Sequence, residues 1–359
     1  MIDLLHHFSA APKNIIEGAY RINSGEQIGP ADIYLIEKKV LQTAGGEHIG
    51  TLHKEVLNFT DGEIWIIFPD QKQITRFFRP NSNSNTILLT EQCDQLCIMC
   101  SQPPKQKDYL HFKLYLDAIK LIDRPCTIGI SGGEPTLYLT EMLDFIATAR
   151  QYNNWVEFHI LTNAQHFKKH HLEALSEVSE YVVWAVPIYS NIPEEHDMIV
   201  GKIGAFKNLQ NNLVFLAMSS SRIEIRTVIL QSNYFSIIGL AKYLTTLLPW
   251  IDAWSIMQLE PKGYAQIDWE TKFCDTSQDF SMIQSAIEIF VAKEMTVSLY
   301  NFPYCTVPKS YRRFVTKSIS DWKQKYINEC MNCKKKKLCG GFFEWYKSET
   351  GYAVIGLER

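Results

Sequence analysis

The chain has 359 residues, of which 46 % are hydrophobic and 21 % are charged, which is typical of a folded globular protein and excludes a disordered one. Its 36 basic and 39 acidic side chains give a formal net charge of −3. This balance disfavours a nucleic-acid partner, which would normally require a basic face.

No membrane segment or secretory signal is expected. The first residues, Met1–His7, lack a basic region followed by an apolar one. The longest apolar stretch, Phe235–Met257, is interrupted by Lys242, Pro249 and Asp252, which favours a buried helix followed by a strand over a membrane span. We expect a cytoplasmic protein with no membrane partner.

Residues 1–82 are predicted to form a small β-rich module. Ile33–Ile36, Glu63–Phe68 and Gln73–Phe78 have the composition of strands. The following segment, Arg79–Asn85, is rich in residues that break regular structure and marks a linker. The module could dock a peptide or partner by strand addition at an exposed edge, or it could simply cover the next domain.

Residues 83–294 alternate short apolar runs with helical segments, which predicts an α/β domain with parallel strands. The predicted strands are Thr86–Leu89, Thr127–Ile130, Val156–Leu161, Tyr181–Val186, Arg222–Leu230 and Trp254–Leu259. The predicted helices include Phe112–Ile122, Thr140–Tyr152, Ala205–Phe215 and Phe235–Leu247. Six such units are fewer than the eight of a closed TIM barrel, so we expect a partial (β/α)6 barrel.

Three cysteines, Cys93, Cys97 and Cys100, follow the first predicted barrel strand with three and two residues between them. Three thiolates can hold three irons of a 4Fe–4S cluster and leave the fourth iron open for a substrate. A structural zinc site is the alternative, but it usually takes four ligands, and this loop supplies three cysteines.

The second predicted strand is followed by Gly132, Gly133, Glu134 and Pro135. In a parallel barrel, the loops after successive strands meet at one end, so the cysteines and this turn are expected to lie together. The combination, with Met99 as the hydrophobic residue before the last cysteine, resembles the signature of radical S-adenosylmethionine (SAM) enzymes. The resemblance implies a partial barrel, an iron–sulfur cluster that binds SAM, and a 5′-deoxyadenosyl radical made by reductive cleavage of SAM.

The same resemblance assigns further residues to SAM. Gly132, Gly133 and Glu134 would contact its amino group, and Asn163, after the third strand, would contact its ribose. Ser190 is the nearest match to a serine that relatives use after the fourth strand. Arg226 is a candidate for the SAM carboxylate, because a guanidinium matches a carboxylate, although a structural ion pair would explain it equally well. With Met99, these are the candidate cofactor-binding residues.

Residues 295–359 are predicted to form a cysteine-rich tail. Cys305, Cys330, Cys333 and Cys339 suffice for a complete second 4Fe–4S cluster, with a four-cysteine zinc ribbon as the alternative. The spacing resembles the auxiliary-cluster region of SPASM and twitch domains. The two remaining cysteines, Cys126 and Cys274, are interpreted as buried thiols.

The combination of motifs from about residue 80 to 345 resembles the C-type radical SAM maturase of the His-Xaa-Ser system. That resemblance implies a peptide maturase that modifies a ribosomally made peptide with His-Xaa-Ser repeats. It also implies a second radical SAM maturase and a small accessory protein as partners, and an external reductant. Two alternatives stay open: a radical SAM enzyme acting on a small molecule in cofactor biosynthesis, and a non-catalytic iron–sulfur scaffold that recruits a peptide to a partner enzyme.

Overall fold

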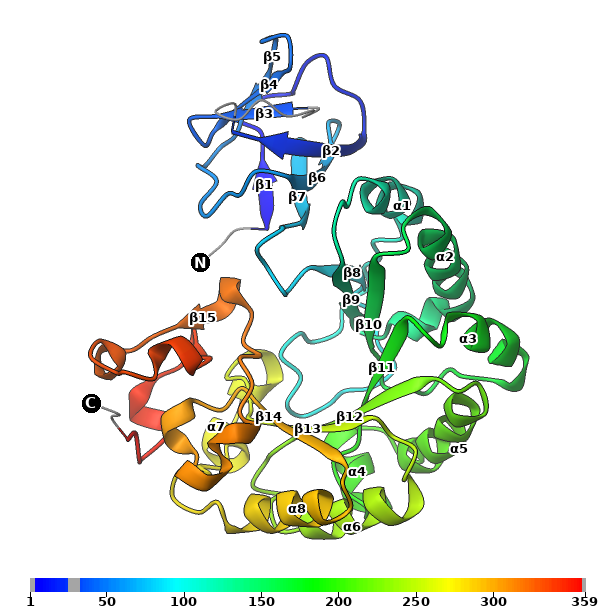
Figure 1. The fold of residues 1–359 in the computed structure, drawn as a ribbon, viewed down its shortest axis with the longest axis vertical. Helices are drawn as coiled ribbons and strands as arrows, with labels where there is room; N and C mark the ends of the chain where they lie inside the picture. Colours follow the sequence, from blue (N-terminus) through cyan, green and yellow to red (C-terminus); the bar gives the residue numbers. More distant parts are fainter. Residues whose placement is uncertain (1–3, 25–32, 357–359) are drawn as a thin grey trace. The chain divides into compact units, whose positions relative to one another are not determined.

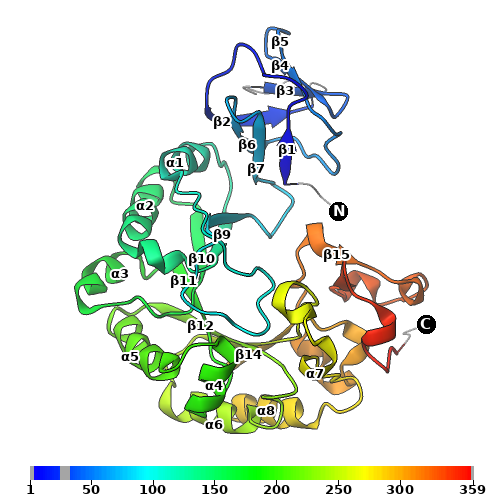
Figure 2. The ribbon, with the colours of Figure 1, turned by 180° about the vertical axis from the view of Figure 1, so that it is seen from behind.

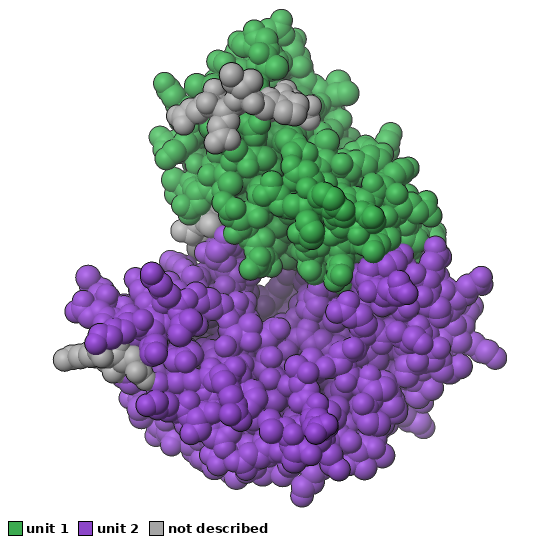
Figure 3. Space-filling view, in the orientation of Figure 1, with its two compact units in different colours: residues 1–88, 109–130, 141–158 green, residues 89–108, 131–140, 159–359 purple. Residues whose placement is uncertain are grey.

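The computed structural model describes residues 4–24 and 33–356. Residues 1–3, at the start of the segment considered as a signal sequence, lie outside the described residues, as does the end of the predicted tail from residue 357. The chain divides into two compact units, coloured separately in Figure 3. Unit 1 comprises residues 1–88, 109–130 and 141–158, and unit 2 comprises residues 89–108, 131–140 and 159–359. The predicted domain boundaries at 82/83 and 294/295 stay predictions.

Two seven-stranded sheets carry most of the regular structure (Figure 1). The strands of the first are β1 (Leu5–His7), β2 (Gly18–Asn23), β3 (Ile33–Ile36), β4 (Val40–Thr43), β5 (His48–Thr51), β6 (Glu63–Phe68) and β7 (Gln73–Phe78). The strands of the second are β8 (Thr86–Thr90), β9 (Cys126–Gly132), β10 (Val156–Leu161), β11 (Val182–Pro187), β12 (Arg222–Val228), β13 (Ala253–Met257) and β14 (Thr296–Tyr300). The helices are α1 (Phe112–Lys120), α2 (Leu139–Tyr152), α3 (Leu172–Val178), α4 (Pro193–Val200), α5 (Ala205–Met218), α6 (Ile237–Leu247), α7 (Trp269–Lys272) and α8 (Ser281–Ala292).

The first sheet has the order β1-β7-β6-β2-β3-β4-β5 and an apolar core that includes Trp65, Leu41 and Ile74. Its end strands, β1 and β5, are joined by a bridge between Phe8 and Leu52. The flanking backbone hydrogen bonds run from Ser9 N–H to Thr51 O and from His53 N–H to His7 O, each 2.8 Å long. The chain next to β1 and the chain next to β5 are therefore joined at this one point, while docking of a peptide or partner by strand addition stays a prediction.

The predicted linker is an ordered turn. The side chain of the buried Asn85 accepts a hydrogen bond from Arg79 N–H at 2.9 Å and donates to the carbonyls of Arg79 and Ser82 at 3.2 and 3.1 Å. The Asn85 side chain thus provides hydrogen-bond partners for three backbone groups in a segment that has no partner strand.

The second sheet has the order β14-β13-β12-β11-β10-β9-β8. The pairs β11–β12, β12–β13 and β13–β14 are parallel. Figures 1 and 2 show β11 to β14 on the inner side of helices α5, α6 and α8. Strands β8 and β14 are the two ends of the sheet, so it is open, as predicted for a partial barrel.

Six strands of the sheet are each followed by a helix, as predicted, but the sheet continues with a seventh strand, so the prediction that the barrel pattern ends at about residue 295 is wrong. The seventh strand is β14, which pairs with β13 from Thr296 to Tyr300. In β14 only Val297 and Leu299 are buried. An alternating pattern of this kind does not resemble a strand that is apolar throughout, which explains why it was missed.

The long apolar stretch folds as predicted, into helix α6 followed by strand β13. Over residues 4–24 and 33–356, no helix has the length and apolar composition that a membrane crossing needs.

Candidate functional site

The cysteine loop follows β8 and is fixed by backbone hydrogen bonds to the end of helix α4. Leu96 N–H donates to Val200 O at 3.1 Å, and Ile98 N–H donates to Ile199 O at 2.9 Å. Carbonyls at the end of a helix have no partners within the helix, and here the loop supplies them. The loop between the cysteines is therefore positioned by an element more than 90 residues away in the sequence.

Three glycines from other loops touch the backbone of the cysteine loop. A Cβ on Gly133 would lie 2.1 Å from Gln92 O, one on Gly201 would lie 2.7 Å from Leu96 O, and one on Gly263 would lie 2.4 Å from Cys100 O. All three distances are shorter than a van der Waals contact, so each position excludes a side chain. Gly132, with φ at +152°, makes the same kind of contact with Thr90 O. The sequence analysis assigned Gly132 and Gly133 to contact with SAM. In this structure, these two glycines allow the turn after β9 to lie close to the backbone of the cysteine loop.

The three thiols of the loop lie close enough to influence one another. Burial raises the pKa of Cys93 to about 12 and raises the pKa of Cys97 and Cys100 as well, and the neighbouring thiols contribute to the shifts of Cys93 and Cys97. Burial also raises the pKa of Tyr189, with contributions from all three thiols, so this tyrosine lies beside them. In the described part of the chain, no three His, Cys, Asp or Glu side chains are arranged to coordinate a metal ion.

Glu134 is fully buried and accepts four hydrogen bonds. Its Oε1 accepts from Thr136 N–H at 2.9 Å, from Thr136 Oγ1 at 2.5 Å and from Thr162 Oγ1 at 2.6 Å, and its Oε2 accepts from Asn163 N–H at 2.5 Å. Burial raises the pKa of this carboxyl in spite of the hydrogen bonds. Glu134 thus ties the turn after β9 to the end of β10, and any contact with SAM would share its oxygens with these donors.

Asp94, next to Cys93, links the cysteine loop to Asn163. Asn163 Nδ2 donates to Asp94 Oδ1 at 2.7 Å, and Lys202 and His166 contact Asp94 Oδ2. Burial alone would raise the pKa of Asp94, but the hydrogen bonds from these three side chains outweigh it and hold the pKa well below its usual range. The structure thereby brings Cys93, Glu134 and Asn163 together, as the sequence predicts.

The other predicted SAM residues have protein partners. Ser190 Oγ donates to Glu195 Oε2 at 2.5 Å and accepts from Ile192 N–H at 3.0 Å. Met99 is buried in an apolar cluster with Tyr189 and Ile199. Arg226 lies on β12, with Nε 3.3 Å from Met257 Sδ. Contact of these residues with SAM stays a prediction.

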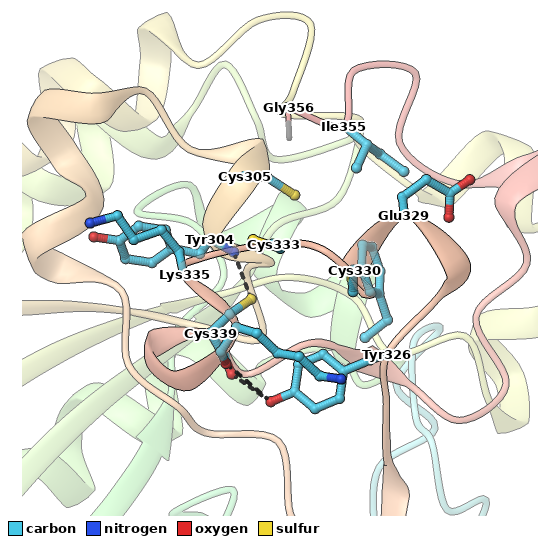
Figure 4. Close-up of a pocket in the computed structure, with 12 residues that line it drawn as sticks. Tyr304, Cys305, Tyr326, Glu329, Cys330, Cys333, Lys335, Cys339, Ile355 and Gly356 are labelled. Atoms are coloured by element: carbon cyan, nitrogen blue, oxygen red, sulfur yellow. Dashed lines mark hydrogen bonds between the residues drawn. The ribbon is translucent and has the colours of Figure 1, made fainter. Parts of the chain in front are cut away.

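The four tail cysteines line one pocket (Figure 4). Cys305 comes from one short 3-10 turn, and Cys330, Cys333 and Cys339 come from the segment that joins the two strands of a small sheet, β15 (Gln324–Lys325) and β16 (Phe342–Phe343). The space between these residues, with the open solvent at its mouth included, is about 420 Å³. Burial and the other three thiols raise the pKa of Cys305 to about 12. The structure therefore brings together the residues that the sequence predicts as a second cluster site.

Backbone N–H groups point at one of these thiols. Tyr304 N–H and Gly341 N–H each donate to Cys339 Sγ at 3.3 Å, and Figure 4 shows the first of these bonds. Hydrogen bonds to cluster sulfurs are one of the means by which proteins set cluster potentials. Four thiols in one pocket supply the ligand types of an iron–sulfur cluster or of zinc, although in the described part of the chain they are not arranged around a single metal ion.

One segment of unit 2, Glu260–Tyr264, contacts both cysteine regions. Tyr264 N–H donates to Cys100 O at 2.8 Å. On the other side, Lys323 Nζ lies 2.9 Å from Glu260 Oε2, and Lys262 Nζ lies 3.9 Å from the centre of the Trp345 ring. The sequence analysis missed this segment, because Pro261, Lys262 and Gly263 have the composition of an ordinary turn.

The interpretation of Cys126 and Cys274 as buried thiols needs correction, because both are partly exposed. Cys126 begins β9 and Cys274 follows α7, so each lies where its element meets a loop.

The fold can be compared with solved structures. Streptococcus suis SuiB bound to S-adenosylmethionine superposes with a TM-score of 0.50 at 18 % identity, over 62 % of this chain and 52 % of SuiB. SuiB bound to its precursor peptide SuiA gives 0.49 at 18 % identity, over 60 % and 47 % of the two chains. AnSMEcpe, with bound AdoMet and a peptide, gives 0.45 at 14 % identity, over 60 % and 63 %. No protein-family profile matches the sequence, and no curated protein matches it.

The matched part spans about half of the SuiB chain, and at this identity the likeness shows the fold alone. The resemblance to radical SAM enzymes that the sequence predicts is confirmed at this level, as an α/β fold built on a parallel sheet.

Proposed function

We propose that this chain is a radical SAM enzyme that modifies a ribosomally made peptide. The observation that carries the proposal is the cysteine loop at the end of β8, held beside Glu134 and Asn163 in a fold shared with SuiB. Bound S-adenosylmethionine in SuiB and anSMEcpe, and bound peptides in structures of both, support SAM as the cofactor and a peptide as the substrate.

In this proposal Cys93, Cys97 and Cys100 hold the SAM-binding cluster. When bound, that cluster supplies the electron that cleaves SAM into methionine and the radical that removes a hydrogen atom from the substrate. The chain's own residues position the reactants: Glu134, Asn163 and the glycine turn face the SAM amino group and ribose, and the burial of the thiols keeps water from the site. Met99 and Ser190 complete the proposed SAM site, whereas Arg226, the sequence-based candidate for the SAM carboxylate, has Met257, Glu224 and Tyr300 around it.

The tail is proposed to hold a second 4Fe–4S cluster on Cys305, Cys330, Cys333 and Cys339. Their common pocket and the N–H donors to Cys339 support this assignment over zinc. Metal analysis of the reconstituted protein tests it: about eight irons per chain are expected for two clusters, whereas about four irons and one zinc would support the zinc ribbon.

The finer assignment rests on the sequence resemblance: a peptide with His-Xaa-Ser repeats as substrate, a second radical SAM maturase and a small accessory protein as partners, and an external reductant. A synthetic peptide with these repeats is the direct probe. Stimulation of SAM cleavage by this peptide, but not by a scrambled one, would support the assignment. A small-molecule substrate would leave both peptides without effect.

The test of the basic proposal uses anaerobically purified, iron-reconstituted protein with dithionite and SAM. We expect release of 5′-deoxyadenosine, and no release from the Cys100→Ala variant. An iron-loaded wild-type protein that releases none, alone and with peptide, would favour the scaffold alternative.

A further inference from the structure

Strand β12 carries two opposite charges on one face of the second sheet. Successive side chains of a strand point to opposite faces. Thr227 faces the helices, because its Oγ1 accepts from Trp254 Nε1 at 2.9 Å and the Trp254 ring packs against Phe290 of α8 at 4.7 Å. Glu224 and Arg226 consequently lie on the other face of the sheet, away from helix α8.

Glu224 has one oxygen in use and one without a partner. Its Oε2 lies 2.5 Å from His159 Nε2, on β10. Its Oε1 has no hydrogen-bond partner among the residues that the structure describes, although Glu224 is only 6 % exposed. Burial would raise the pKa of this carboxyl, but the hydrogen bond from His159 and the charge of Arg226 lower it to about 2, so Glu224 is ionised at neutral pH.

Arg226 forms an ion pair with Glu224 that is too long to be a hydrogen bond. Its Nε is 3.9 Å from Glu224 Oε1, beyond hydrogen-bond distance, and 3.3 Å from the thioether sulfur of Met257. Its guanidinium lies over the Tyr300 ring, with Cζ 5.9 Å from the ring centre. A buried carboxylate and a partly buried guanidinium are thus held as a loose ion pair, with hydrogen-bonding capacity unused on the carboxylate.

A ligand for this pair must satisfy both charges. A carboxylate would match Arg226 but would bring a negative oxygen next to Glu224 Oε1, and a cation would match Glu224 but would be repelled by Arg226. An amide is neutral, with a donor N–H and an acceptor C=O on adjacent atoms, so it can donate to Glu224 and accept from Arg226. A peptide carries such a group at every residue and on Asn and Gln side chains.

We propose that Glu224 and Arg226, with His159 holding the carboxylate in place, form a binding site for an amide group of the peptide substrate. The inference rests on the proposed function and adds a point of substrate recognition to it. It gives Arg226 a ligand other than the SAM carboxylate, so the two assignments of Arg226 can be tested against each other.

The direct test is a crystal structure of the iron-loaded protein with SAM bound, soaked in N-methylacetamide or, in parallel, in acetate. We expect N-methylacetamide with its N–H at Glu224 Oε1 and its carbonyl at the Arg226 guanidinium, and no acetate at the same place. The proposal is overturned by the SAM carboxylate on Arg226, by acetate in place of the amide, or by water alone with both probes.

A solution test separates this site from SAM binding. The variants Arg226→Met and Glu224→Gln are expected to keep the wild-type SAM dissociation constant within about twofold, and to weaken the peptide's stimulation of SAM cleavage by roughly tenfold or more. Arg222→Met, an exposed change on the same strand, serves as the control and should alter neither quantity. A tenfold loss of SAM affinity in Arg226→Met would overturn the proposal.

Peptide-independent release of 5′-deoxyadenosine by the wild-type protein is measured in the same samples. If that release is present and the amide site is empty, only this inference fails. If wild-type protein, alone and with peptide, releases none, the proposed function fails.

Discussion

The two cysteine regions of unit 2 are built in different ways. The loop with Cys93, Cys97 and Cys100 is held by hydrogen bonds to helix α4 and by close contacts with glycines of three other loops. The tail pocket is built from its own short turns and a two-stranded sheet, and its Cys339 thiol takes N–H donors from residues near it in the pocket. The cysteine loop is therefore positioned by elements from several parts of the chain. The tail pocket depends mainly on the spacing of residues within its own segment.

The largest expected difference is chemical. Cys97→Ala should abolish 5′-deoxyadenosine release, because the SAM-binding cluster loses a ligand. Cys333→Ala should lose the tail cluster and still release 5′-deoxyadenosine. Product is quantified by chromatography and iron by metal analysis on the same samples. Loss of release in both variants would mean that the tail site is required for the first step, and that the two regions are not separable.

Glu134 lies beside the cysteine loop, and its substitution tests how much this region contributes to the free energy of unfolding. Glu134→Gln should lower the free energy of unfolding by about 3 kcal/mol, since hydrogen bonds to a buried charged group contribute about 1.5–3 kcal/mol each and Gln cannot accept all of them. Urea denaturation of the metal-free protein measures the change. Glu141→Gln, an exposed position at the start of α2, is the control and should change it by less than about 0.5 kcal/mol. If Glu134→Gln also changed the free energy of unfolding by less than about 0.5 kcal/mol, this would contradict the conclusion that Glu134 holds the turn after β9 to the end of β10.

Gly263 provides a test of the contacts that hold the cysteine loop in place. Gly263→Ala adds a Cβ against Cys100 O, and it also strains a backbone with φ at +63°, so we expect a loss of roughly 2–3 kcal/mol. The electron paramagnetic resonance signal of the SAM-binding cluster should weaken, while the tail cluster keeps its iron.

The matched control is Gly204→Ala. Gly204 has a similar φ of +80°, but a Cβ there would have no atom within 4 Å. It therefore carries the backbone strain without the steric clash. Equal effects of the two variants on the cluster signal would show that strain alone, and not contact with Cys100, explains the result.

The smallest expected effect depends on pH. His196 lies between the rings of Tyr189 and Phe206 on α4, the helix that holds the cysteine loop. Burial lowers its pKa from 6.5 to about 4. The folded state thus binds fewer protons than the unfolded state between these values, so stability is complete above pH 6.5 and falls as the pH drops toward 4.

Because of His196, the free energy of unfolding should be about 1 kcal/mol lower at pH 5.5 than at pH 7.5. Urea denaturation at pH 7.5 and 5.5 measures it, with His196→Gln expected to remove this part of the pH dependence. The exposed His53 offers the control variant His53→Gln, which should retain it. An unchanged pH dependence in His196→Gln would show that other groups are responsible.

Local patterns in the sequence predicted much of the fold and the site. Strand β10 and the first residues of α1 and α5 match the predicted bounds, because continuous apolar runs and helical periodicity are local properties. The convergence of Cys93, Glu134 and Asn163 followed from strand order, since loops after parallel strands meet at one end. The four tail cysteines were grouped by spacing alone, and they line one pocket.

What the sequence did not reveal depends on contacts between distant residues. Asp94 is held by Asn163, His166 and Lys202, and no local pattern pairs these residues. Gly263 has the same local signature as a glycine in any turn, and only the position of Cys100 shows why a side chain is excluded there. The unused oxygen of Glu224 is likewise visible only once His159 and Arg226 are placed around it.

The bridge in the first sheet between Phe8 and Leu52 has a consequence for the behaviour of the chain in concentrated solution. Unpaired end strands are templates on which sheets of separate molecules join and aggregate. Since the residues next to β1 and β5 are hydrogen-bonded to each other, part of both edges is unavailable to another molecule at this point. Opening this bridge, for example with Ser9→Pro, which removes the N–H donor to Thr51 O, would free both edges at this point and make aggregation, more than loss of catalysis, the first visible defect.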